Sequence, residues 1–223
     1  MSYYQYQQPQ RDIYADPMAS LILSKLYNGL LFGTLTAFLT AFFVSDPNTA
    51  GIIIVFAFIG EVIAIIGYFF AKNEITIERL YYLFVGSSSA LLGFTIQSYL
   101  AIEGGSTIVL GAVGITTLIV AYTYNRARTK NPDLNQLSSR LFPLSIVFIV
   151  LLIGSWFIQV GSIFMIFFSL FGAILFSLYL YFDFARVMQG AIRSPARSAW
   201  RLYWDILLIF RYLLYFLGGV SRR

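Results

Sequence analysis

The fold is decided by residues 141–182, which read LFPLSIVFIVLLIGSWFIQV at 141–160 and GSIFMIFFSLFGAILFSLYLYF at 161–182. No charged residue occurs in this stretch, and only a short connection near Gly161 interrupts it. A helix needs about 20 apolar residues to cross a bilayer. The stretch therefore predicts two membrane-spanning helices, 141–160 and 163–182, which form a tight antiparallel hairpin because their connection is so short.

Five further apolar runs predict membrane-spanning helices: 27–44, 52–71, 81–102, 107–124 and 202–220. The last run is the least uniform, because Asp205 and Arg211 interrupt it. We expect an all-α integral membrane protein, a seven-helix transmembrane bundle in which residues 18–223 form a single domain. Residues 1–17 are rich in Gln and Tyr, a composition typical of a disordered polar tail.

The composition supports this class of protein. Hydrophobic residues make up 59% of the 223 residues, charged residues only 11%, and the mean hydropathy is +0.76, whereas about 25% of residues are charged in soluble proteins. The absence of Cys and His excludes disulfides, thiolate or imidazole metal sites and Ser–His triads. We therefore expect neither an enzyme nor a cofactor, and any proton or cation chemistry must use carboxylates, which favour hard cations and protons.

Basic residues are distributed unequally on the two sides of the seven spans. Twelve Lys and Arg fall on the side of the N-terminus and the second, fourth and sixth connections, and the other side has only Arg222 and Arg223. Loops rich in Lys and Arg remain in the cytoplasm. We therefore expect a cytoplasmic N-terminus and an outside C-terminus, and we interpret the net charge of +5 as a topology signal and not as a nucleic-acid surface.

Ionisable residues inside the apolar runs are candidates for function, because a charge near the bilayer centre is costly. Glu61 is the tenth residue of run 52–71, and Arg211 is the tenth of run 202–220, so similar depths make them candidates for an intramembrane ion pair. Arg211 could equally serve only as a structural counter-charge. Lys72 follows Glu61 by eleven residues, which places it on the same face of a continuous helix, about 16 Å away.

Asp183 and Asp205 lie on consecutive antiparallel spans near the predicted cytoplasmic mouth, so they are candidates for a carboxylate pair. Two carboxylates in a poorly hydrated place cannot both ionise cheaply, so they share a proton and titrate as a coupled pair. We hypothesise that the shared proton ties the two helices together and that its loss adds about 1–3 kcal/mol of repulsion. We expect Lys72 to act as the counter-charge of this pair, because a nearby positive charge favours the ionised form. Asp183, at the end of its predicted span, can alternatively be an interfacial residue. Two other acids, Glu74 and Glu78, are expected to be solvated loop residues.

Three segments resemble a known family. They are FIGEVIAIIGYFFAK at 58–72, FSLYLYFDFARVM at 176–188 and LYWDILLIFRYLLYFLGG at 202–219. Their order and spacing resemble the Bax inhibitor-1 family, also called the transmembrane Bax inhibitor motif or YccA-like family. The similarity extends from about Lys25 to Gly219.

The resemblance implies a seven-helix bundle in which the last helix is central, between two groups of three. It also implies a pH-sensitive calcium leak channel gated by Asp183 and Asp205, with a weak, transient Ca²⁺ site between them, and it maps Glu61 and Lys72 onto the acidic and basic residues of the second span. The match departs in the last helix. Bacterial members carry an Arg where this chain has Tyr215, and Arg211 lies about one turn earlier.

Three alternatives remain at this stage. Some relatives regulate other membrane proteins, a membrane protease or cell-death factors, by binding them without transport. An intramembrane aspartyl protease also needs two membrane-embedded Asp residues, but its Gly-x-Gly-Asp motif is absent here. A proton-coupled transporter using Glu61 would show an inverted repeat, which is not evident. The expected surroundings are a lipid bilayer with Ca²⁺ and H⁺, in a prokaryotic plasma membrane.

Overall fold

The structure is a computed structural model that describes residues 17–44, 46–130, 132–157, 161–192 and 194–221. This part of the chain forms seven α-helices and no strand. They are α1 (Pro17–Phe43), α2 (Pro47–Phe70), α3 (Glu74–Leu100), α4 (Gly105–Thr129), α5 (Leu134–Phe157), α6 (Ser162–Met188) and α7 (Pro195–Ser221). All seven are long and apolar enough to cross a membrane. The predicted all-α class and all seven predicted spans are confirmed. Residues 1–16 of the predicted polar tail lie outside the described residues, and residue 17 is the first residue of α1.

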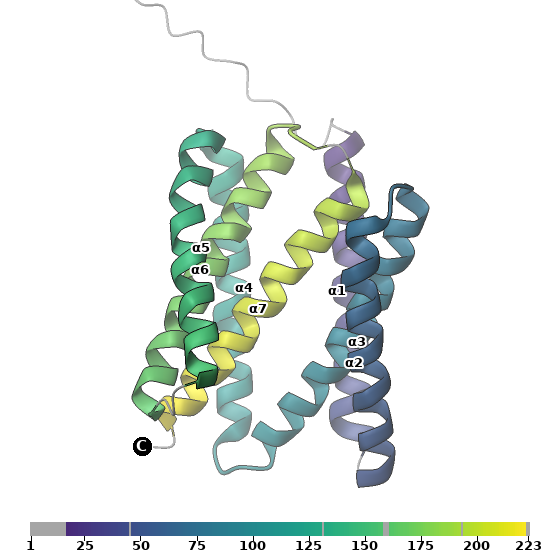
Figure 1. Ribbon diagram of the computed structural model, residues 1–223, viewed down its shortest axis with the longest axis vertical. Coiled ribbons are helices and arrows are strands. Elements are labelled where there is room, and N and C mark those ends of the chain that lie inside the picture. The colour runs from purple at the N-terminus through teal and green to yellow at the C-terminus, as the bar shows by residue number, and fades with distance from the viewer. Residues whose placement is uncertain (1–16, 45, 131, 158–160, 193, 222–223) are drawn as a thin grey trace, which may run out of the picture.

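The helix α7 lies at the centre of the bundle. It packs against α1, α3, α4 and α6, while α2 packs on α3 and α5 packs on α6. Figure 1 shows α7 running obliquely between the group α1–α3 and the group α4–α6. Two groups of three around a central last helix are the arrangement that the family resemblance implies.

Close approach of α1, α3 and α7 depends on small residues. At Gly33 of α1, an added Cβ would lie 2.7 Å from both Ser89 Oγ and Tyr203 Oη. These two oxygens are 2.6 Å apart and form a buried hydrogen bond between α3 and α7. Because any larger side chain at position 33 would displace this bond, the glycine allows three helices to meet at one point.

Near the ends of several helices, local capping fixes where they begin and end. Asp46 caps α2 by accepting a hydrogen bond from Thr49 N at 2.8 Å, and Pro47 occupies the first turn. At its other end, α2 stops at Phe70, because Ala71 has an extended backbone with ψ 126°. Gly104, with φ 71°, precedes α4 in the left-handed conformation that glycine accepts.

The start of α3 is bonded to the start of α7. The Glu74 carboxylate accepts hydrogen bonds from Ala196 N at 2.7 Å and Ser194 Oγ at 2.6 Å, and Arg197 Nη2 donates to Ala71 O at 2.5 Å. We call these five residues the α3–α7 clasp. The expectation that Glu74 is a solvated loop residue is therefore wrong, because α3 begins seven residues before the apolar run and brings the carboxylate to α7.

The expectation that Glu78 is a solvated loop residue is wrong for the same reason. Glu78 lies in the second turn of α3, where it forms an ion pair with Lys25 of α1. This contact and the clasp join α1, α3 and α7 at the end of the bundle that carries the α2–α3 and α6–α7 connections.

Candidate functional site

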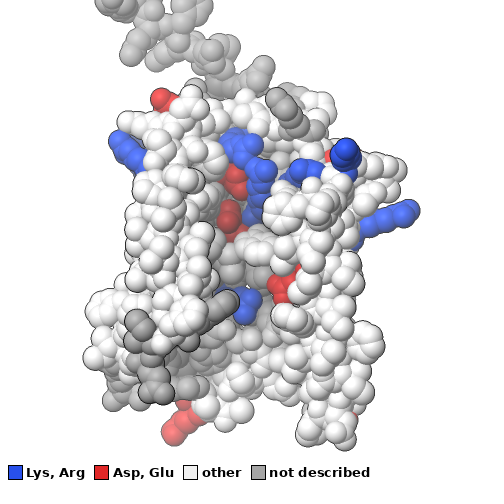
Figure 2. Space-filling view, viewed as in Figure 1, with Lys and Arg blue, Asp and Glu red and all other residues white. Residues whose placement is uncertain are grey.

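A cavity of about 430 Å³ opens between α2, α6 and α7. Its walls are the residues Ile65, Tyr68, Phe69, Phe176, Tyr179, Phe182, Asp183, Arg186, Trp200, Arg201, Trp204 and Asp205. Figure 2 shows the recess on this face, between the two groups of helices, with acidic and basic side chains gathered inside it. In Figure 2, further charged side chains lie near the upper and lower ends of this face, outside the recess.

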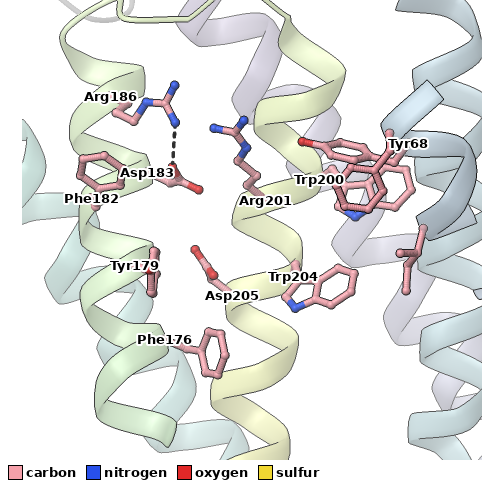
Figure 3. Close-up of a pocket in the computed structure, with 12 residues that line it drawn as sticks. Tyr68, Phe176, Tyr179, Phe182, Asp183, Arg186, Trp200, Arg201, Trp204 and Asp205 are labelled. Carbon is pink, nitrogen blue, oxygen red and sulfur yellow. Dashed lines mark ion pairs between the residues drawn. The ribbon is translucent and has the colours of Figure 1, made fainter. Parts of the chain in front are cut away.

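Asp183 of α6 and Asp205 of α7 are both buried, with 8% and 7% of their surfaces exposed. In Figure 3 the two carboxyl groups point toward one another across the cavity. No hydrogen bond joins them within the described part of the chain, and Asp205 Oδ2 is a buried atom with no hydrogen-bond partner there. The structure thus brings together the two carboxyls that the sequence analysis paired.

An unpartnered buried carboxyl oxygen is costly, by about 1–3 kcal/mol for a neutral group and more for a charged one. The second carboxyl acts on the first electrostatically, so full ionisation of both adds repulsion to this cost. Binding a proton, or a cation that reaches the cavity, reduces both the cost of the unpartnered oxygen and the repulsion between the carboxylates. The pair is therefore chemically suited to sense protons and to contact a passing cation.

Two arginines face this pair. Arg186 of α6 places Nη1 3.6 Å from Asp183 Oδ1. Arg201 of α7 interacts electrostatically with both carboxylates and forms a side-chain hydrogen bond with Tyr68 of α2. Neither arginine was among the site residues predicted from the sequence, because both were interpreted as topology signals. Their spacing was the available signal, since positions three or four residues from a helical Asp share its face.

Lys72, expected as the counter-charge to the pair, is exposed and does not line the cavity. The expectation assumed that the helix continued from Glu61 to Lys72. Because α2 ends at Phe70, the helical repeat no longer fixes the direction of the Lys72 side chain. The cations that the structure brings to the carboxylates are Arg186 and Arg201.

Glu61 of α2 and Arg211 of α7 are each half-buried and interact electrostatically. Among the described residues, however, the ion pairs within 4.0 Å are Lys25–Glu78 and Arg186–Asp183 only. The structure thus places Glu61 and Arg211 within each other's field without direct contact. Neither residue lines the cavity of the aspartates.

The described residues contain no cluster of three or more side chains suited to hold a metal ion. Ca²⁺ prefers six to eight oxygen ligands, and the acidic side chains on the cavity wall are Asp183 and Asp205. This donor set fits brief contact with a hydrated cation better than stable storage.

A second cavity, of about 700 Å³, lies among α1, α3, α4 and α7 and is lined mainly by apolar side chains. It contacts α7 through Tyr203, Ile206, Leu207 and Phe210. These positions lie on the face of α7 opposite Arg201 and Asp205, because the helix repeats every 3.6 residues. The helix α7 therefore separates an apolar cavity from the charged one.

Seven membrane-length helices around a buried, arginine-flanked carboxylate pair define a multi-pass membrane protein whose charged site lies inside the helix bundle. The chain belongs to the family described as inhibitor of apoptosis-promoting Bax1, whose family model matches residues 19–222. This result confirms the resemblance to the Bax inhibitor-1 family.

Curated relatives come from bacteria. An uncharacterized protein of Helicobacter pylori is 33% identical over 170 residues, which cover 74% of this chain and 72% of the relative. An uncharacterized protein of Campylobacter jejuni is 30% identical over 126 residues, which cover 56% of this chain and 54% of the relative. Both relatives are bacterial proteins, and their names state no activity.

Proposed function

We propose that this protein is a pH-sensitive cation leak of the membrane, that Ca²⁺ is the cation, and that Asp183 and Asp205 gate it. The observation that carries the proposal is the buried Asp205 carboxyl, with an unpartnered oxygen, facing Asp183 across a cavity between α2, α6 and α7. Membership of the Bax inhibitor-1 family supports the same proposal.

The gating step follows from the two protonation states. While the pair shares one proton, the carboxyls attract one another and α6 stays against α7. Loss of the proton leaves two like charges in a dry place, which adds about 1–3 kcal/mol of repulsion. A free-energy difference of that size shifts a two-state equilibrium by about 5- to 150-fold, enough to make the open form depend on pH.

We also propose the plasma membrane of a bacterium as the location, with the N-terminus in the cytoplasm and the C-terminus outside. The basic connections support this orientation. The cavity lies toward the end of the bundle that holds the α6–α7 connection, because Asp183 and Arg186 are near the end of α6 and Arg201 is near the start of α7. In the proposed orientation that end is cytoplasmic, so the pair responds to the pH of the cytoplasm.

Reconstitution of the purified protein in liposomes tests the proposal. We expect Ca²⁺ flux to be about fivefold or more higher at pH 8 than at pH 6, with Na⁺ and K⁺ flux measured in parallel. Asp183→Asn combined with Asp205→Asn should remove this pH dependence. Glu103→Gln is the matched control, because Glu103 is an exposed acid in the α3–α4 connection.

Two outcomes would contradict the proposal. If the double Asn variant keeps the pH dependence of the wild type, the carboxylate pair is not the gate. If the wild-type protein gives no cation flux at any pH, the alternative is favoured, a membrane regulator that acts by binding other membrane proteins. Under either reading we propose no enzymatic activity and no cofactor.

A further inference from the structure

We infer that Arg201 is the counter-charge of the carboxylate pair, that it sets the pH at which the pair loses its shared proton, and that it opposes cation entry while the proton is held. The inference rests on the proposed function. It assigns to a residue of α7 the part that the sequence analysis gave to Lys72.

The position of Arg201 on α7 supports its role as the counter-charge. It precedes Asp205 by one helical turn and lies on the cavity wall. Figure 3 shows its guanidinium extending from α7 into the space beside both carboxyls, with the Tyr68 hydroxyl directed toward it. The hydrogen bond with Tyr68 holds the guanidinium from the α2 side, so its charge stays near the pair.

Arg186 and Arg201 differ in the number of carboxyls on which they act. It acts on Asp183 alone, whereas Arg201 acts on Asp183 and on Asp205. The Arg186 side chain is also 31% exposed and lies over the Phe182 ring, 5.6 Å from its centre. Arg201 is therefore the cation that both carboxylates share.

Few other groups can set the charge of the cavity. The titratable side chains on its wall are Tyr68 from α2, Tyr179, Asp183 and Arg186 from α6, and Arg201 and Asp205 from α7. Within the described residues, α1, α3, α4 and α5 add none to the wall. Two arginines and two aspartates on this wall therefore fix the charge of the cavity.

The charges of these four residues cancel when both carboxyls are ionised. When the pair holds one proton, one positive charge remains uncompensated. At the short distances inside the cavity, such a charge repels a divalent cation. The proton then acts in two ways, because it removes the repulsion between α6 and α7 and it makes the entrance positive.

The effect of removing Arg201 has a defined sign. A positive charge favours the ionised form of a nearby carboxyl, so Arg201→Gln makes loss of the shared proton harder. We expect the pH midpoint of Ca²⁺ flux to rise by about 1 unit. Above that midpoint the ionised cavity carries a net negative charge, so the flux at its alkaline plateau should exceed that of the wild type.

Two measurements on the full-length protein in liposomes test this inference. The first is the pH profile of Ca²⁺ flux. The second is tryptophan fluorescence against pH in a Trp156→Phe background, because the chain has 3 Trp and the remaining two, Trp200 and Trp204, line the cavity. Asp183→Asn with Asp205→Asn should abolish the fluorescence transition, which identifies it as the titration of the pair.

Four variants separate charge from structure. Arg201→Gln should raise both midpoints by about 1 pH unit, and Arg201→Lys, which keeps the charge, should restore them. Arg186→Gln should give a smaller rise, and Lys72→Gln, the matched control outside the cavity, should give none. If Arg201→Gln is not recovered folded, Arg201→Met replaces it, since it keeps the aliphatic stem without the charge.

The outcomes distinguish this inference from the proposed function. Equal midpoints for the wild type, Arg201→Gln and Arg201→Met overturn the role of Arg201, and so does a shift that Arg201→Lys does not reverse. If fluorescence midpoints shift as expected while no variant conducts cations, the assignment of Arg201 to the pair stands and the leak does not.

Discussion

At the scale of single residues, Glu61 and Arg211 show how two charges can interact without touching. They belong to α2 and α7 and are each half-buried, and no N–O contact within 4.0 Å joins them. A charge inside a helix bundle is costly unless another charge or water balances it. Each side chain therefore depends on the other through the electric field and not through a fixed hydrogen bond.

A double-mutant cycle measures this dependence. We expect Glu61→Gln and Arg211→Gln to be coupled by about 0.5–1 kcal/mol in the free energy of unfolding, a small value because half-buried charges are partly screened. Titration with a denaturing detergent in mixed micelles provides the measurement. Glu103→Gln combined with Arg211→Gln is the control and should show no coupling. A coupling equal to the control would mean that the two charges are independent.

Asp46 gives a second prediction at this scale. Hydrogen bonds from the Thr49 hydroxyl, at 2.6 Å, and then from its backbone amide hold the pKa of Asp46 below its ordinary value. A pKa that is lowered by folding stabilises the start of α2 above about pH 4, and this contribution is lost as the pH falls through the folded pKa.

Asp46→Ala should therefore speed hydrogen exchange at the Thr49 amide near pH 7, because the exposed amide loses its acceptor. The protection of this amide in the wild type should fall toward that of the variant as the pH decreases through the folded pKa of Asp46, which lies below its ordinary value. Equal protection of the two proteins near neutral pH would show that the cap does not stabilise the helix start.

The site residues show what sequence reasoning can reach. Asp183 and Asp205 line the same cavity, as their positions near one connection between antiparallel helices suggest, because spacing limits their separation. Arg186 and Arg201 were not predicted as site residues, because basic residues near the ends of a span usually indicate topology. The direction of such a long side chain also depends on packing, which the sequence does not give. Tyr68, which holds Arg201, comes from α2, and no spacing along the chain predicts that contact.

At the scale of the helices, hydropathy located all seven spans but not their ends. The last span was predicted from residue 202, whereas α7 begins at Pro195. An apolar run marks only the part of a helix that lies among hydrocarbon chains, and backbone hydrogen bonding continues into polar sequence beyond it. The α3–α7 clasp lies in these polar extensions, so its contacts could not be predicted from the apolar pattern.

The clasp makes a testable contribution to the stability of the bundle. Glu74→Ala removes the acceptor of Ala196 N and Ser194 Oγ at the start of α7. Hydrogen bonds to a charged group contribute about 1.5–3 kcal/mol, so we expect the free energy of unfolding to fall by about 1–3 kcal/mol. Glu103→Ala, at an exposed acid, should change it by less than about 0.5 kcal/mol. Equal losses would mean that the clasp is not stabilising.

At the scale of the whole molecule, the central α7 explains how one local event can affect the entire bundle. It contacts both groups of helices and separates the charged cavity from the apolar one. A displacement of α6 from α7 changes the contact between the two groups, because α4 and α6 are the helices of the second group that touch α7. The proposed proton switch lies at this contact.

The orientation of the bundle in the membrane decides to which compartment's pH the proposed proton switch responds. Cysteine labelling can measure this orientation, because the chain contains no native cysteine. Glu103→Cys places one thiol in the α3–α4 connection, and Lys130→Cys places one at the end of α4, where both native side chains are exposed. If the basic connections are cytoplasmic, a membrane-impermeant maleimide should label position 103 in intact bacterial cells and position 130 only after permeabilisation. The reverse pattern would place the Asp183–Asp205 cavity on the outer side, and the protein would then respond to external pH.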